Sequence, residues 1–83
     1  MFFYSVFDKA IQAYTRPFIM RSNGEALRSF MNEVLDNVES PMNRHPEDYG
    51  LFRLGTFDER TGMIVGEEPV CIARAHELVA DKE

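Results

Sequence analysis

The sequence predicts a single α+β domain over residues 1–83, in which one main helix packs on an antiparallel sheet of about four strands. Two aromatic and β-branched runs, 2–7 and 51–57, indicate strands, and an amphipathic segment between them indicates a helix. The chain is too short for a second domain. We therefore expect the order strand, strand, helix, strand, strand.

The first two strands differ in character. Residues 2–7 are largely apolar on both faces, which indicates a central strand or a strand with one face covered by a second chain. A connector at 8–13 leads into a second extended run at 14–20. Pro17 interrupts that run and cannot donate a hydrogen bond to a strand ladder, so we expect an edge strand or an irregular one.

The main helix is the clearest local feature. Ser22 and Asn23 are suitable N-cap residues, and the helix is expected to end near Asn37, because Ser40 and Pro41 make continuation unfavourable. The apolar side chains follow the spacing of one buried helix face. They are Ala26, Leu27, Phe30, Met31, Val34 and Leu35.

The second half of the chain predicts a hairpin and a final helix. A polar loop over 41–49, with one turn starting at Pro46, leads to the strand at 51–57. The segment 58–62 is a hairpin turn, and 63–65 pairs back as a short strand. Apolar residues near the end recur at roughly helical spacing and favour a short C-terminal helix over a fifth strand. They are Ile72, Ala75, Leu78 and Val79.

The net charge of −5 is unevenly distributed. Residues 1–31 carry four basic and two acidic side chains, a balance of +2, whereas residues 32–83 carry five basic and twelve acidic side chains, a balance of −7. An acidic chain lacks the broad positive field that drives non-specific binding to nucleic acid. Any contact with DNA is therefore expected to be local and to lie in the first third of the chain.

The cysteine content limits how the fold can be stabilised and indicates the redox compartment of the protein. Cys71 is the only cysteine, so an internal disulfide is excluded, and oligomerisation remains as a way to stabilise so thin a core. We expect self-association through the N-terminal strand. A single cysteine, no export signal and no membrane-spanning segment predict a protein of the reducing cytosol.

Patterns for catalysis and metal binding are weak. Cys71 and His76 are the only nominal nucleophile and base, and in a helix they would point to different sides, so Cys71 is expected to be a small buried residue. His45, Glu47 and Asp48 could seed a divalent-metal site, but a short capped turn with solvated carboxylates is the favoured interpretation. We expect a protein that binds its partner without catalysis and without a cofactor.

One group of residues indicates binding of nucleic acid. Aromatic rings, guanidinium groups and a helix N-terminus occur close together, and single-stranded nucleic acid is bound by ring stacking combined with local cations. The candidate contacts are Tyr14, Arg16, Phe18, Arg21 and Arg28, the first three on one face of a strand. In the alternative interpretation both rings belong to the core, and Arg16 and Arg21 pair with carboxylates of a neighbouring strand.

Two blocks of sequence resemble a known family. The first block is Tyr14-Thr15-Arg16-Pro17-Phe18 with Arg21-Ser22-Asn23-Gly24-Glu25-Ala26. The second is Ser40-Pro41, His45-Pro46-Glu47-Asp48-Tyr49, Leu51-Phe52 and Leu54-Gly55-Thr56-Phe57-Asp58. In this order they resemble the small nonstructural protein of gokushovirus-type microviruses, the single-stranded DNA phages of the Chlamydia-phage lineage. The resemblance implies a non-enzymatic DNA-binding protein, or a factor in single-stranded genome synthesis, acting in the host bacterial cytoplasm.

Two hypotheses for function remain. The first is a phage protein that binds single-stranded DNA and assists synthesis or packaging of the single-stranded genome. The second is an acidic, oligomeric adaptor that contacts a phage or host replication protein, or a procapsid protein, with little direct DNA binding. The −7 balance of residues 32–83 and the two apolar faces of the first strand favour the second hypothesis.

Overall fold

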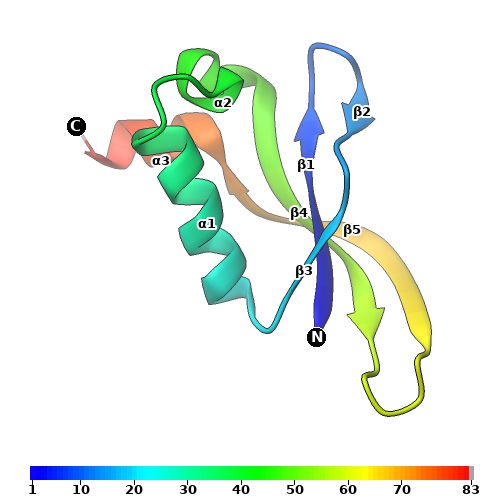
Figure 1. Ribbon diagram of the computed structural model, residues 1–83. Helices are drawn as coiled ribbons and strands as arrows, with labels where there is room; N and C mark the ends of the chain where they lie inside the picture. The colour runs from blue at the N-terminus through cyan, green and yellow to red at the C-terminus, as the bar shows by residue number, and fades with distance from the viewer. Residues whose placement is uncertain (83) are drawn as a thin grey trace.

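In the computed structural model, which describes residues 1–82, the N-terminal strand is central in a five-stranded antiparallel sheet (Figure 1). This strand, β1 (Phe2–Asp8), pairs on one side with β4 (Tyr49–Phe57). On its other side it pairs with β2 (Ala13–Tyr14) and then with β3 (Phe18–Met20). β5 (Ile64–Arg74) pairs with β4 and forms the opposite edge. The predicted α+β class and the central first strand are confirmed.

The second predicted strand is split at Pro17. β2 ends at Tyr14 and β3 begins at Phe18, and together they form one interrupted edge beside β1. Proline is tolerated there because an edge residue can leave the outward side of the ladder unpaired. The prediction of an irregular edge strand is confirmed, and the interruption explains why the sheet has five strands rather than about four.

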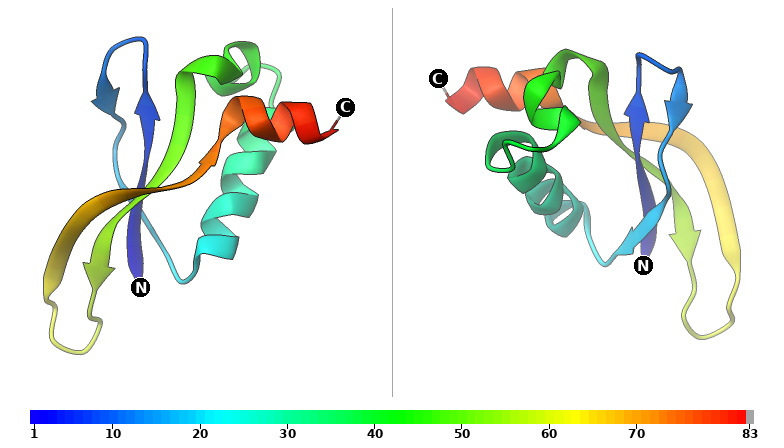
Figure 2. Two further views of the ribbon diagram at one scale, coloured as in Figure 1. Left: turned by 180° about the vertical axis from the view of Figure 1, so that it is seen from behind. Right: turned by 45° about the horizontal axis from the view of Figure 1, so that its top comes forward.

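Two helices, α1 (Asn23–Leu35) and α3 (Ala75–Lys82), lie on one side of the sheet, which we call the inner face (Figures 1 and 2). The core lies between the inner face and these helices. Its buried apolar residues are Tyr4, Val6, Ala26, Phe30, Val34, Leu51 and Ala75. Because neighbouring residues of a strand point to opposite faces, Phe3, Phe7 and Phe52 lie on the other side, which we call the open face.

Tyr4 connects the central strand β1 to both the edge strand β3 and the main helix α1. Its side chain is 0% exposed, and its hydroxyl donates a hydrogen bond of 2.6 Å to Asn23 Oδ1 at the start of α1. Its ring stacks on Phe18 of β3, with 5.9 Å between the ring centres. One residue of β1 thereby fixes the positions of both the edge strand and the main helix.

The main helix begins at the predicted cap and ends two residues before the predicted Asn37. Ser22 is the N-cap, and its hydroxyl accepts a hydrogen bond of 3.2 Å from the backbone N–H of Glu25. The helix ends at Leu35, with Asp36 as the C-cap. Of the predicted apolar face, Ala26, Phe30 and Val34 are buried in the core and Leu35 packs against it, which confirms this part of the prediction. Leu27 and Met31 are only partly buried and line a shallow hollow on the helix surface instead.

The polar loop after α1 contains more structure than the sequence suggests. The predicted turn is confirmed as a 3-10 helix over Pro46–Asp48. A short helix, α2 (Pro41–Arg44), was not expected. Ser40 caps it, its hydroxyl accepting a hydrogen bond of 3.2 Å from the N–H of Met42. The Ser-Pro pair thus starts this helix, whereas α1 has already ended five residues before Ser40.

The prediction of a short strand at 63–65 is wrong, because β5 extends over 64–74 and includes Ile72. Between the pairs Gly55–Gly66 and Arg53–Val70, β5 advances four residues while β4 advances two. The extra residues form a bulge around Pro69, where no ladder hydrogen bond is required. Helix α3 follows directly at Ala75, so the short C-terminal helix is confirmed but begins after Ile72.

Cys71 is also placed differently from the prediction. It is exposed, whereas the sequence suggested a small buried residue. Cys71 pairs with Phe52 across β4 and β5 and therefore shares the open face with it. The difference arises because an edge strand on an uncovered face buries few of its side chains.

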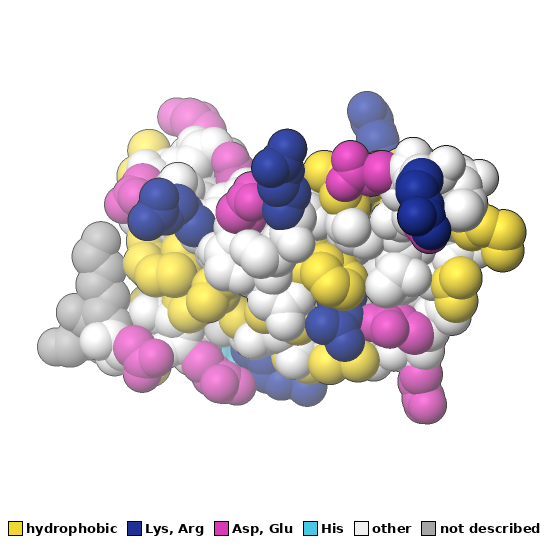
Figure 3. Space-filling model, turned by 90° about the horizontal axis from the view of Figure 1, so that it is seen from below, with side chains coloured by type: hydrophobic (Ala, Val, Ile, Leu, Met, Phe, Trp, Pro, Cys, Tyr) yellow, Lys and Arg dark blue, Asp and Glu magenta, His cyan; other side chains and the backbone are white. Residues whose placement is uncertain are grey.

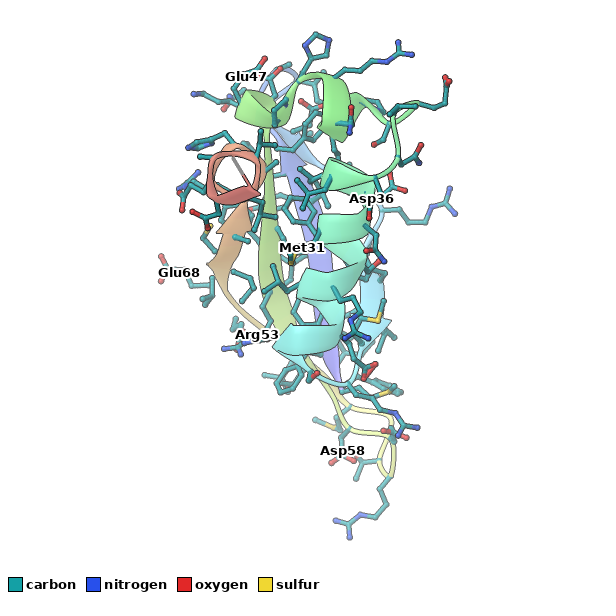
Figure 4. The ribbon with its side chains drawn as sticks, turned by 90° about the vertical axis from the view of Figure 1, so that its left-hand side faces the viewer. Met31, Asp36, Glu47, Arg53, Asp58 and Glu68 are labelled. Atoms are coloured by element: carbon teal, nitrogen blue, oxygen red, sulfur yellow. The ribbon has the colours of Figure 1, made fainter. Side chains whose placement is uncertain are left out.

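The hairpin that joins β4 to β5 extends beyond the helices, with Asp58 at its far end (Figure 4). The Asp58 carboxylate accepts hydrogen bonds from the N–H groups of Arg60 and Thr61, at 2.9 and 3.3 Å, and these bonds lower the pKa of Asp58. Gly62 closes the turn with a φ of 77°, a conformation that favours glycine. The predicted hairpin turn over 58–62 is confirmed.

We predict opposite effects of alanine at the two glycines that pair across β4 and β5. A methyl group on Gly55 would overlap the carbonyl oxygen of Val65, whereas one on Gly66 meets no atom within 4 Å. Gly55→Ala should therefore lower the free energy of unfolding by about 1–3 kcal/mol, and Gly66→Ala should leave it nearly unchanged. Urea unfolding of both variants at one low protein concentration checks this, and equal effects would contradict the strand pairing.

A second prediction concerns alkaline pH. Burial raises the pKa of Tyr4 above its ordinary value of 10.0, with the nearby Arg53 acting in the opposite direction. The unfolded chain therefore ionises before the folded one, so stability is fully present below pH 10 and falls as the pH rises above it. Tyr4→Phe should cost about 1 kcal/mol at neutral pH through the lost hydrogen bond and should show a smaller alkaline decline.

Urea unfolding between neutral pH and pH 11 measures this difference. Some alkaline decline should remain in Tyr4→Phe, because burial and the neighbouring Asp8 also raise the pKa of Tyr49. An alkaline decline identical in the two proteins would contradict the role given to Tyr4.

Candidate nucleic-acid interface

Because the edge strand is interrupted, Tyr14 and Phe18, two of the residues predicted to contact nucleic acid, lie on opposite faces of the sheet. Tyr14 pairs with Phe7 and Phe18 pairs with Tyr4, so between these pairs β1 advances three residues while the edge advances four. One extra residue in a strand reverses the facing of everything beyond it. Tyr14 thus lies on the open face and Phe18 on the inner face. The expectation that both project from one face is wrong.

Thr15 stabilises this irregularity. Its backbone N–H donates to the carbonyl of Val6 at 2.8 Å, and its hydroxyl accepts a hydrogen bond from the Val6 N–H at 3.2 Å. The buried hydroxyl of Ser5 donates to the Thr15 carbonyl at 2.6 Å. These bonds replace the regular ladder, so the extra residue leaves no buried polar side chain without a partner among the described residues.

Tyr14 presents a ring to solvent on the open face. It is 42% exposed and makes edge-on contacts with Phe7 and Phe52, with ring centres 4.9 and 5.7 Å away. The two phenylalanine rings support it from below and fix its orientation. A supported, partly exposed ring of this kind is suited to stacking with an unpaired base.

Phe18 is placed as the alternative interpretation expects. It is half-buried, stacks on Tyr4 and packs against the core. Most of its ring surface is used inside the protein. Its predicted role in contacting DNA is limited to the exposed rim of the ring.

The basic residues of the first third of the chain carry unpaired charges. Among the side chains that the structure describes, Lys9, Arg16, Arg21 and Arg28 have no carboxylate within ion-pair distance. The alternative in which Arg16 and Arg21 pair with a neighbouring strand is therefore not observed.

Basic residues of the second part are mostly paired. Arg44 lies 3.5 Å from Glu39, Arg53 lies 2.6 Å from Glu67, and Arg74 lies 3.9 Å from Glu77. Arg60, at the tip of the hairpin, is the exception among the described arginines of this part. Available positive charge is thus concentrated along the first third, although the chain as a whole is acidic.

These cations follow the edge of the sheet and the helix that continues from it. Arg16 lies between β2 and β3, Arg21 directly precedes the N-cap of α1, and Arg28 lies on the side of α1 away from its buried residues. All three are exposed. We call Arg16, Arg21 and Arg28 together with Tyr14 the basic edge. Seen from below, basic, acidic and apolar side chains are mixed over the visible face of the molecule, and this view shows no continuous basic surface (Figure 3).

The N-terminus of α1 is less suited to phosphate than the sequence suggests. The Ser22 hydroxyl already accepts from the Glu25 N–H, and Asn23 accepts from Tyr4. The Glu25 carboxylate also lies in the first turn, where it repels an incoming anion. Side-chain cations, rather than the helix end, are the available phosphate contacts.

The sequence did not point to three residues of the open face, two of which are the rings that support Tyr14. Phe7, Phe52 and Lys9 line a shallow groove of about 300 Å³ on the open face, together with Arg74 and His76. Glu47 and Asp48 line the same groove, so its charge is mixed. The signal for Phe7 was present, because the first strand is apolar on both faces. Lys9 had no comparable signal, since it lies in a connector.

The turn over 45–48, which the sequence offered as a possible metal site, is exposed at His45 and Glu47. His45 Nδ1 lies 3.7 Å from Glu47 Oε1 at the exposed turn, and within residues 1–82 no three His, Cys, Asp or Glu side chains gather as metal ligands do. In the same part of the chain no helix is long and apolar enough to cross a bilayer.

Comparison with known proteins identifies the family. Neither the curated proteins nor the solved structures include a match to this chain. The family model described as phage ORF5 protein matches residues 1–78, which includes every strand, α1 and the whole basic edge. The chain therefore belongs to the phage ORF5 protein family.

Proposed function

We propose that this protein binds single-stranded DNA in the infected host cell and assists genome synthesis or packaging in a gokushovirus-type phage, without catalysing a reaction. The observation that carries the proposal is the set of exposed arginines without an ion-pair partner among the described side chains, Arg16, Arg21 and Arg28, which follow the same edge of the sheet as the exposed ring of Tyr14. The resemblance to microvirus nonstructural proteins supports the setting, and membership of a phage family agrees with it.

The basic edge has the dimensions of a short single-strand site. From Tyr14 to Arg21 an extended chain covers about 20 Å, at roughly 3.3 Å per residue, which is the length of a few nucleotides. Tyr14 can stack one base at one end, and Arg16 and Arg21 can contact phosphates along the way. Arg28 extends the path along α1.

Two features favour single-stranded over double-stranded DNA. A ring can stack only on a base whose face is free, which excludes the interior of a duplex. Duplex binding also relies on a wide positive field, and the net charge of −5 opposes it. Binding through three or four cations should be modest and strongly dependent on salt.

The first test is reversal of charge on the basic edge. Arg16→Glu/Arg21→Glu removes two phosphate contacts, so affinity for a labelled oligonucleotide at low salt should fall at least about tenfold, and the salt dependence should weaken by roughly 1.4 in logarithmic slope. Fluorescence anisotropy at two salt concentrations, with single-stranded and duplex oligonucleotides, measures both quantities. Circular dichroism verifies that the variant remains folded.

Arg44→Glu/Arg60→Glu is the matched control. It changes the net charge equally but lies at α2 and the hairpin tip, away from the basic edge. The control should bind far better than the edge variant. Equal losses in both variants would reduce the effect to net charge and remove the assignment to the edge.

The second test separates stacking from charge. Tyr14→Ala should weaken binding by about 1–3 kcal/mol, since that is the usual contribution of one stacked base, and should leave the salt dependence unchanged. Tyr14→Phe keeps the ring and should bind like the original protein. Binding unaffected by Tyr14→Ala would show that the ring takes no part.

A second candidate function is an adaptor for another phage or host protein. It is favoured by the large exposed apolar side chains of the hairpin, among them Met63, Ile64 and Val65 at 60%, 66% and 55% exposure. The same titration discriminates the two. Wild-type protein without affinity for single strands at low salt would exclude the first proposal and leave the adaptor.

A further inference from the structure

A row of four paired residues crosses the open face at the end of the sheet away from the hairpin. Tyr14 of β2 pairs with Phe7 of β1. Phe7 pairs in turn with Gly50 of β4, and Gly50 pairs with Arg74 of β5. Because residues that pair directly share a face of the sheet, the row consists of two rings, a gap and an exposed cation, all on the side of Tyr14.

Gly50 leaves the gap in this row. A Cβ at Gly50 would lie 3.1 Å from Cε1 of Phe52, so the glycine makes room for that ring beside it. The gap belongs to the shallow groove of about 300 Å³ that Phe7 and Phe52 line. Both rings also contact Tyr14, with centres 4.9 and 5.7 Å away. The apolar wall of the groove therefore continues the surface that supports the exposed ring.

Charges of both signs line the rim of the same groove. Lys9, directly after β1, has no ion-pair partner among the side chains that the structure describes. Glu47 and Asp48 directly precede β4, and Glu47 lies at the end of the molecule opposite to Asp58 (Figure 4). The backbone N–H of Lys9 donates to the Asp48 carbonyl at 2.8 Å. This bond holds a cation and a carboxylate at one end of the groove.

The arrangement fits a flat ring that has hydrogen-bond donors on its edge and is attached to an anion. Aromatic side chains stack on unpaired bases, carboxylates accept hydrogen bonds from base amino groups, and cations contact the phosphates. A free anion would be repelled by Glu47 and Asp48, and a purely apolar ligand would leave the charged rim without a partner. A nucleotide of a single strand satisfies all three parts of the groove.

We propose that this groove binds a second base of the strand, beside the base stacked on Tyr14, and that Glu47 and Asp48 select bases with an exocyclic amino group. The inference rests on the proposed function and adds to it the class of base that is preferred. Tyr14 and Gly50 lie two strand spacings apart, about 10 Å at roughly 4.8 Å per strand, so nearby bases of one extended strand can occupy both places. Lys9 then contacts a phosphate beyond the basic edge.

Cytosine and uracil give the most direct test, because they have nearly the same size and present different edges. The amino group of cytosine donates to a carboxylate, whereas uracil carries a carbonyl oxygen at the same position, which a carboxylate repels. Fluorescence anisotropy with oligonucleotides of deoxycytidine and deoxyuridine, equal in length and at low salt near neutral pH, measures the preference. We expect the original protein to bind the deoxycytidine strand at least about fivefold more tightly.

Glu47→Gln/Asp48→Asn removes both carboxylates and keeps the size of the side chains. The lost negative charge should strengthen binding of the deoxyuridine strand. The deoxycytidine strand loses its charged acceptors, so the preference should fall to about twofold or less. General electrostatics alone would instead strengthen binding of both strands equally, and circular dichroism verifies that the variant remains folded.

Glu59→Gln/Glu68→Gln is the matched control. It changes the net charge equally, at two exposed residues of the hairpin turn and β5 that do not line the groove. It should strengthen binding of both strands alike and preserve the preference. Lys9→Gln should weaken binding of both strands and lower the logarithmic salt slope by roughly 0.7, again without changing the preference.

The outcomes separate this inference from the proposed function. Equal binding of the two strands by the original protein would overturn the base selection and leave binding at the basic edge in place. A preference that survives Glu47→Gln/Asp48→Asn would overturn the assignment to the groove. Absence of binding to either strand would refute the proposed function, and this inference with it.

Discussion

Tyr4 lies where the central strand, the edge strand and the main helix meet, and the two sides of the sheet acquire their different roles there. Its ring is fully buried against Phe18, and its hydroxyl bonds to Asn23 at the first residue of α1. Because adjacent residues of β1 point to opposite faces, burial of Tyr4 and Val6 on the inner face places Phe3 and Phe7 on the open face. This explains why β1 is apolar on both faces. Its inner face contributes side chains to the core, and on its open face Phe7 contacts the exposed ring of Tyr14 and Phe3 contacts Phe57.

The one-residue irregularity between β2 and β3 decides which aromatic residues are available to a ligand. A regular strand would place Tyr14 and Phe18 on one face, because they are four residues apart. The hydrogen bonds of Thr15 to Val6 and Ser5 accommodate an extra residue instead. Phe18 can then complete the core while Tyr14 remains exposed on the supporting rings of Phe7 and Phe52. A local break in pairing therefore lets one ring complete the core and leaves the other exposed to solvent.

Much of this fold can be predicted from the sequence where local chemistry and tertiary packing agree. The main helix follows from the Ser22 cap and its apolar face, and the edge position follows from Pro17. Prediction fails at β5, because the interpretation of Glu67-Glu68-Pro69 as a break assumes a regular ladder, whereas a bulge on an edge strand tolerates all three residues. Cys71 fails for a related reason, since its usual burial does not apply on an uncovered face.

In the candidate site, too, some features follow from the local sequence and others depend on tertiary structure. Composition locates the available positive charge correctly in the first third, since Arg16, Arg21 and Arg28 have no ion-pair partner among the described side chains. The facing of Tyr14 and Phe18 depends on hydrogen bonds between residues distant in sequence, and no local pattern reveals it. The contribution of Phe7 and Phe52 likewise depends on strand pairing, which brings together residues from the two halves of the chain.

The acidic balance of the chain and its small basic edge are compatible if binding sites act together. In the proposed mode of binding, a few cations and one stacking ring would give modest affinity for DNA, and the net charge of −5 would limit it further. We expect the protein to self-associate, and an oligomer would present more than one basic edge to one strand, so that the second contact would form at a high effective concentration. Such a protein would hold a long single strand, which offers many neighbouring sites, and would release short fragments. Selectivity for a long single-stranded genome would then arise from the combination of two weak interactions, without a strong contact at either surface.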